Sequence, residues 1–151
     1  MGEGTQDISV EQLKLKYSCE VLLAMAAECI TFWQADGELP QLKIVWNTRL
    51  RTSAGRALLR EQVVELNPRL LSKNEQDIRA VLVHELAHLL AVARYGQVKA
   101  HGREWQQLMI EAGADPKVCH SMDASAFYHR RKRSALSGNR FLRRFLERLI
   151  K

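Results

Sequence analysis

The sequence predicts an α+β fold in which a small, mostly antiparallel sheet of about three strands packs against helices. Apolar residues recur every three or four positions over residues 10–35 and 75–95, which is the period of a helix. Between these segments lie three short apolar runs of strand length, at residues 42–46, 57–59 and 62–66. The chain has 151 residues, which suits one domain rather than two.

The first helical segment, residues 10–35, is expected to be one helix that buries one apolar stripe. Gly37 and Pro40 end this helix, because neither residue continues a helix well. The stripe consists of residues three or four apart, namely Leu13, Tyr17, Val21, Met25, Cys29 and Phe32.

Turn signals separate the three strand-like runs: Asn47, residues 53–55 and the pair Asn67-Pro68. A second helix is expected from Asn74 or Glu75 to just before Gly96, with acidic residues in its first turn. A third is expected over residues 102–112. Residues 114–138 have the composition of irregular structure, and a last short helix is expected over residues 140–151.

Charge is unevenly distributed along the chain. Nine of the 23 basic residues and one of the 17 acidic residues lie within residues 130–151, which gives that segment a net charge of +8. The other 14 basic and 16 acidic residues give residues 1–129 a net charge of −2. We therefore divide the chain into a near-neutral domain, residues 1–125, and a basic C-terminal segment, residues 126–151, with a short amphipathic helix.

The composition favours a cytoplasmic protein. A hydrophobic content of 46% excludes a wholly disordered chain. The three cysteines form no closely spaced pair, so a disulfide framework is not expected. The longest apolar run, residues 21–33, contains Glu28 and is too short to span a bilayer. The first seven residues include Glu3 and Asp7 and no basic residue, whereas a secretory signal begins with basic ones.

One motif carries metal chemistry: His84-Glu85-Leu86-Ala87-His88, on the helix expected over residues 75–95. Residues four apart lie one above the other on a helix, so His84 and His88 can chelate one metal ion. Glu85 lies about 100° around the helix from His84, where it can reach a metal-bound water without being a ligand. This is the H-E-x-x-H arrangement of zinc proteases, in which the glutamate is the general base when that water attacks a peptide carbonyl.

A purely structural alternative is that these polar residues only cap the helix or face solvent, but the strongly apolar sequence around them disfavours it. A catalytic zinc site also needs a third protein ligand. The metzincin pattern would place Gly at 91 and His at 94, and the chain has Ala91 and Arg94 instead. The downstream candidates are His101, Glu104, Glu111, His120 and His129.

The H-E-L-A-H run followed by H-G-R-E-W at residues 101–105 resembles the SprT-like zinc metallopeptidases, the family that includes Spartan. Residues 52–57, 64–71 and 114–120 are also similar to stretches of that family, and the resemblance extends over residues 10–120. It implies a zincin-like fold, with the small sheet packed on the active-site helix. It also implies one catalytic Zn²⁺ on His84, His88 and His101, with Glu85 as general base.

The chain departs from many SprT-like proteins, which continue into a zinc ribbon of paired cysteines. No cysteine follows Cys119, so a second zinc on four cysteines is not expected. Relatives of Spartan cleave proteins crosslinked to DNA, which makes such proteins a candidate substrate class. Mn²⁺ and Co²⁺ are alternative metals, although three neutral imidazoles suit zinc well.

Other residues near the motif have open roles. Three roles are open for Glu104: a third metal ligand, a residue that orients a liganding histidine, or an acid in the first turn of the third helix. Trp105 is expected to pack in the core rather than to touch substrate. Candidates for stabilising an oxyanion are Tyr95, His120, Tyr128 and His129.

The basic segment has three interpretations. Its apolar residues 141, 142, 145, 146, 149 and 150 would form one stripe of a helix, which favours docking on the domain. Its positive charge favours binding to nucleic acid, and the combination of both also suits an anionic membrane surface. The candidate nucleic-acid-binding residues are Arg130, Arg131, Lys132, Arg133, Arg143 and Arg144.

The sequence therefore predicts a zinc-dependent endopeptidase that acts on proteins in the cytoplasm. DNA is a candidate partner, and binding to it would associate the enzyme with the nucleoid. We expect substrate to pair as an added strand with residues 63–66, just ahead of the active-site helix. One alternative is a DNA-associated zinc-binding module with a vestigial protease site, which would need the histidines but not Glu85. Another is a regulatory peptidase with one dedicated substrate.

Overall fold

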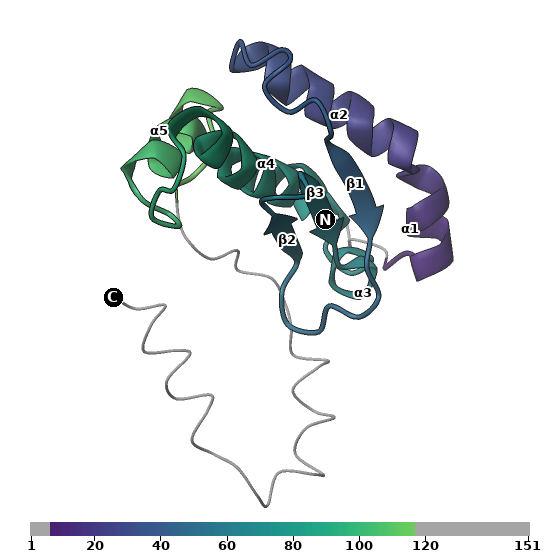
Figure 1. Ribbon diagram of the computed structural model, residues 1–151. Coiled ribbons are helices and arrows are strands. Elements are labelled where there is room, and N and C mark those ends of the chain that lie inside the picture. Colours follow the sequence, from purple (N-terminus) through teal and green to yellow (C-terminus); the bar gives the residue numbers. More distant parts are fainter. Residues whose placement is uncertain (1–6, 117–151) are drawn as a thin grey trace, which may run out of the picture.

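The computed structural model describes residues 7–116, and within them the α+β class is confirmed (Figure 1). Most of the stretch expected to be irregular, the basic segment and the helix expected over residues 140–151 lie outside these residues. In chain order the elements are α1 (Val10–Lys16), α2 (Cys19–Phe32), β1 (Lys43–Trp46), β2 (Gly55–Leu58), β3 (Val63–Leu66), α3 (Pro68–Leu71), the 3-10 helix η1 (Glu75–Asp77), α4 (Ile78–Tyr95) and α5 (Arg103–Glu111).

The expectation of one long N-terminal helix is wrong, because the chain forms two helices there. α1 ends at Lys16, and the Ser18 hydroxyl begins α2 by accepting a hydrogen bond from the N–H of Val21. The break shifts the apolar face, so that Val21 and Phe32 are exposed rather than buried. The residues of this region that do enter the core are Leu13 and Cys29 of the predicted stripe, together with Leu22, Ala26, Trp33 and Ala35.

The later helices agree closely with the sequence pattern. The second predicted helix is η1 followed by α4, which ends at Gly96, a glycine in the left-handed region with φ 75°. The third is α5, one residue shorter at each end than expected. The short helix α3 differs from the prediction of a turn at Asn67-Pro68. An asparagine cap followed by proline is also a helix start signal.

The three-stranded sheet is mixed, with the order β1-β3-β2. β2 and β3 form an antiparallel hairpin, but β1 pairs with β3 in parallel, so the expectation of a mostly antiparallel sheet is wrong for one of the two pairs. Residues 47–54 carry the chain from one edge of the sheet to the other. β3 is therefore the central strand, and substrate cannot pair with residues 63–66 as we expected.

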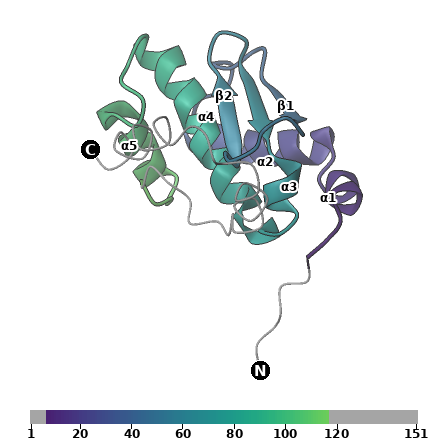
Figure 2. The same ribbon diagram turned by 90° about the horizontal axis from the view of Figure 1, so that it is seen from below.

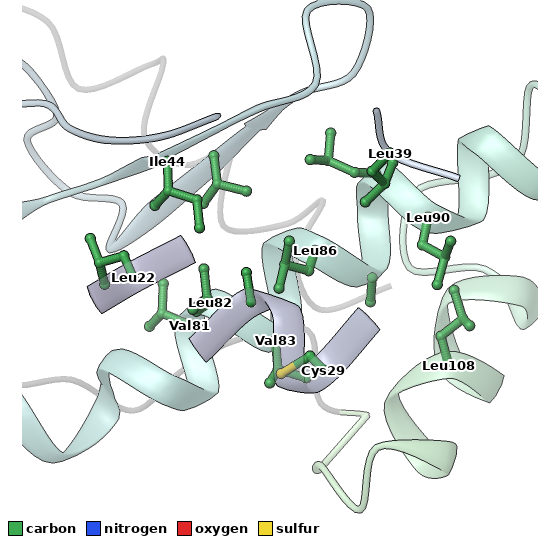
Figure 3. Close-up of a cluster of buried hydrophobic side chains, with 14 of the residues drawn as sticks. Leu22, Cys29, Leu39, Ile44, Val81, Leu82, Val83, Leu86, Leu90 and Leu108 are labelled. Atoms are coloured by element: carbon green, nitrogen blue, oxygen red, sulfur yellow. The ribbon is translucent and has the colours of Figure 1, made fainter. Parts of the chain in front are cut away.

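α2 and α4 pack against each other and against the sheet, and α4 lies between α2 and α5 (Figures 1 and 2). The core joins α2, β1, α4 and α5 through Leu22, Ile44, Leu82, Leu86 and Leu108 (Figure 3). On the solvent face of the sheet Arg56 Nε lies 2.8 Å from Glu65 Oε2. Within residues 7–116, no helix combines the length and the apolar composition that a membrane crossing requires.

Asn67 fixes the loop that leads into β2. Its side chain is fully buried, and its Oδ1 accepts hydrogen bonds from the N–H groups of Arg69 (3.0 Å) and Leu70 (3.3 Å), which caps α3. Its Nδ2 donates to the carbonyls of Leu50 (3.1 Å) and Ser53 (3.0 Å). Asn67 therefore holds residues 47–54 against α3 and sets where β2 begins.

We predict that Asn67→Ala lowers the free energy of unfolding by about 2–4 kcal/mol, measured by urea denaturation. The variant loses the cap of α3 and leaves two carbonyls in the loop without their donor. Asn47→Ala is the matched control, because within residues 7–116 the side chain of Asn47 accepts a single hydrogen bond, from the N–H of Arg49 at 2.9 Å, and about 1 kcal/mol or less is expected. Equal losses in the two variants would contradict this role of Asn67.

Candidate metal centre

The site is built on the buried face of α4. Its neighbours on the helix are apolar and fully or nearly fully buried, which holds His84 and Glu85 inside the protein with 5% and 8% of their surfaces exposed. His88 lies one turn further along the same face and is partly buried. The helix therefore presents two imidazoles and one carboxylate to the interior, where each needs a polar partner.

His101 reaches this face from the loop between α4 and α5. A tight turn, in which the N–H of Gly102 donates to the carbonyl of Lys99 at 2.8 Å, brings the chain back toward α4. His101 itself adopts φ 56°, a left-handed conformation that is uncommon for a residue with a side chain. Gln106 Nε2 donates to its carbonyl at 3.1 Å. The loop thus holds the ring of His101 over α4 in a conformation that local sequence preference alone would not select.

The three rings converge through their Nε2 atoms. His101 Nε2 lies 3.1 Å from His84 Nε2 and 3.0 Å from His88 Nε2. One ligand atom from each of the three histidines lies within 4.8 Å of the others, so they are close enough to bind a single metal ion. Tetrahedral zinc with nitrogen ligands at about 2.0–2.1 Å requires nitrogen separations of about 3.3 Å, so the arrangement fits zinc.

Burial keeps two of the three imidazoles, those of His88 and His101, in the form that can bind a metal ion. Desolvation, and secondarily the charge of His101, lowers the pKa of His88 to about 4. Desolvation also lowers the pKa of His101 below its usual value. Both imidazoles are therefore neutral at neutral pH, which is the state in which a ring nitrogen can donate its lone pair to a metal.

Trp105 forms the wall behind the three rings. It is fully buried on α5, as expected for a core residue, and its ring centroid lies 4.8 Å from that of His84 and 4.7 Å from that of His101. It stacks on His88 with an interplanar angle of 23° and a centroid distance of 5.4 Å. Its indole N–H donates to the carbonyl of His84 at 3.2 Å. The sequence predicts the burial of Trp105 but not these contacts.

Glu85 lies against the sheet. A hydrogen bond with the backbone of Ala57 on β2 favours its charged form, but desolvation outweighs it and raises the pKa of Glu85 to about 7. A carboxyl group with this pKa can both accept and release a proton near neutral pH. The glycine beside it, Gly55, was part of a stretch that resembled the family. A glycine inside a strand indicates a close approach of another group, and this is the signal that could have identified the contact.

Other candidates do not join this group. Among the described residues Glu104 and Glu111 are not members of the three-histidine cluster. Tyr95 is exposed at the end of α4, two turns from His88 and about 10 Å along the helix axis. His120, Tyr128, His129 and the candidate nucleic-acid-binding residues lie outside the described residues.

The chain is similar to one known protein family and to several of its named proteins. The model of the SprT-like family matches residues 22–124. The protein named SprT of Pasteurella multocida is 44% identical over 75 residues, 48% of this chain and 46% of that protein. The one of Serratia proteamaculans is 47% identical over 73 residues, 48% of this chain and 42% of that protein. The chain thus spans about half the length of these curated relatives. No solved structure matches.

We predict that, without metal, Glu85→Gln stabilises the protein in a pH-dependent manner. The unfolded carboxyl titrates near pH 4.5 and the folded one near pH 7, so the folded state holds the extra proton between these values. The wild type therefore loses stability as the pH rises through this window, and the variant does not share this loss. The difference should grow to about 3 kcal/mol above about pH 8.

Urea denaturation with a chelator present, repeated between about pH 5 and pH 8, measures this difference. Glu61→Gln is the control, because Glu61 is an exposed carboxylate in the β2–β3 turn. A stability difference between Glu85→Gln and the wild type that stays constant over this range would refute the prediction.

Proposed function

Because the chain belongs to the SprT-like family and brings three histidines within metal-binding distance, we propose that it is a zinc-dependent endopeptidase. The convergence of the Nε2 atoms of His84, His88 and His101 beside a buried Glu85 is the observation that supports this most strongly. A neutral three-imidazole set suits zinc over Mg²⁺ or Ca²⁺, which prefer oxygen ligands. The cytoplasm, where cysteines stay reduced, is the location that we propose for the enzyme.

In this proposal His84, His88 and His101 hold the zinc ion. When bound, zinc supplies Lewis acidity that activates water and polarises a peptide carbonyl. A carboxylate oxygen of Glu85 accepts the proton of the attacking water and later delivers it to the leaving amine. In the metal-free protein desolvation raises the pKa of Glu85 to about 7, and the charge of a bound zinc ion would lower it toward the carboxylate form that a general base needs.

The position of β2 suggests where substrate binds. The N–H of Asn67 donates to the carbonyl of Ala54 at 2.8 Å, and the register pairs Gly55 with Leu66 and Ala57 with Val64. In an antiparallel pair this pattern directs the N–H and C=O groups of Gly55 and Ala57 away from β3. Among the described residues no strand covers that edge. We place an extended substrate along the outer edge of β2, beside Glu85, rather than along β3.

Part of this edge already has intramolecular partners. The Ala57 backbone hydrogen-bonds Glu85, and the Ser53 hydroxyl donates to the carbonyl of Gly55. Among the described residues the N–H of Gly55 and the carbonyl of Ala57 remain for a substrate backbone. Pairing of substrate with β2 would therefore begin with these two groups.

The test pairs metal content with proteolysis. We expect about one zinc per chain in both the wild type and Glu85→Gln. The wild type should cleave an unfolded protein such as casein at least about 10²-fold faster than Glu85→Gln does. His101→Ala should lose zinc, whereas Glu104→Gln should retain both zinc and activity. Zinc in the wild type without cleavage would instead favour the zinc-binding module or a peptidase with one dedicated substrate. Absence of zinc would refute the proposal.

The buried Glu85 favours the peptidase over the zinc-binding module. A module that only holds zinc needs the histidines, and a carboxyl group that is 8% exposed next to them would only destabilise it. A residue that lowers stability but enables proton transfer is typical of a catalytic site.

We further propose that the basic segment brings the peptidase to DNA-bound or DNA-crosslinked proteins. The support is the net charge of +8 over residues 130–151, with Arg130, Arg131, Lys132, Arg133, Arg143 and Arg144 as the expected phosphate contacts.

Deletion of residues 130–151 should abolish binding to single-stranded DNA without changing casein cleavage in its absence. Wild-type affinity should fall about 300-fold between about 50 and 200 mM salt, because about six phosphate contacts to a single strand release counterions. Fluorescence anisotropy at several salt concentrations measures both effects. DNA binding that survives the deletion would contradict this role. A deletion that lowers only the melting temperature would favour a docking helix.

A further inference from the structure

The backbone of β2 approaches Glu85 more closely than a side chain on β2 would permit. A Cβ atom built on Gly55 would lie 2.9 Å from Glu85 Cγ, 3.1 Å from Glu85 Oε1 and 2.8 Å from Val81 Cγ1. Carbon atoms in good contact are about 3.5–4.0 Å apart. Gly55 is not among the glycines with a left-handed φ, so the requirement for glycine here is one of space and not of backbone conformation.

The same strand also holds the carboxylate. The Ala57 N–H points away from β3 by the register of the hairpin, and the backbone of Ala57 hydrogen-bonds Glu85. Gly55 and Ala57 lie on the same face of β2, two residues apart. One therefore provides the space that the side chain occupies, and the other provides a donor that fixes where its charged end lies.

We propose that β2 is the positioning element for the general base and that Gly55 is its positioning residue. This inference rests on the proposed function, in which Glu85 moves the proton. The α4 helix sets where Glu85 begins, but a glutamate side chain has three rotatable bonds, and the contacts with β2 select one arrangement. A methyl group at residue 55 would displace Glu85 Cγ by about 0.6 Å, which is more than a catalytic constellation tolerates.

Gly55→Ala tests this inference. We expect kcat on casein to fall about tenfold or more, because the base is displaced relative to the site of attack. KM should change little, and zinc affinity and the absorption spectrum of the Co²⁺-substituted protein should remain as in the wild type. The three nearest atoms to the new methyl group belong to Val81 and Glu85, not to a histidine. Loss of zinc from Gly55→Ala would overturn the inference.

Val81→Ala and Gly55→Ala/Val81→Ala are the matched controls. Shortening Val81 removes its contact with the new methyl group and leaves the contact with Glu85. If Gly55 acts through Glu85, the double variant stays as impaired as Gly55→Ala, whereas Val81→Ala alone retains the wild-type kcat. Recovery of kcat in the double variant would show that Gly55 only allows α4 to pack, and this would overturn the inference.

A second measurement does not depend on activity. Gly55→Ala should lower the melting temperature of the metal-free protein by about 4 °C or more in the wild-type background and clearly less in the Glu85→Ala background, where the Cγ and carboxylate are missing. Equal losses in the two backgrounds would overturn the inference. If the wild type binds zinc but cleaves nothing, the proposed function fails, and this cycle still decides the contact between Gly55 and Glu85.

Discussion

The burial of two imidazoles and a carboxyl group on one face of α4 is the constraint on which the rest of the structure depends. α4 is surrounded by apolar side chains from α2, the sheet and α5, and a polar group placed there destabilises the fold unless it has a partner. The partners come from two parts of the chain: the segment that follows α4, and the strand β2. The α4–α5 loop and α5 bring His101 and Trp105 to the histidines, and β2 brings Ala57 to Glu85.

This division separates two requirements of the site. The histidines must converge on one point, and three contacts from the ring of Trp105, together with its hydrogen bond to the carbonyl of His84, hold α5 and α4 in the necessary relation. The carboxyl group of Glu85 has a different support, because the backbone of Ala57 on β2 hydrogen-bonds it and Gly55 leaves space for its side chain. In the proposed function, substitutions on α5 would therefore act first on the histidines and substitutions on β2 first on Glu85.

The sheet matters to the site mainly because of its strand order. With β3 in the centre, β2 becomes the edge next to α4, and its outward backbone groups become available to Glu85 and to a substrate. Asn67 makes this order definite, since it joins the loop before β2 to the helix after β3 through four side-chain hydrogen bonds. Asn67, which lies outside the three-histidine cluster, thus helps to determine where β2 supports Glu85.

The local features and the family can be predicted from the amino-acid sequence: the helix of the motif, the four-residue spacing of His84 and His88, and a helix over residues 102–112. These follow from short-range periodicity and from a motif, both of which are readable along the chain. Three features become apparent in the folded chain: the N-terminal segment breaks at Ser18, β1 pairs in parallel with β3, and Gly55 lies against Glu85. The reason is that strand pairing and close approach join residues far apart in the chain, and no local pattern encodes the partner. His101 stands between the two cases, because a motif indicated it, but a strained loop conformation places it.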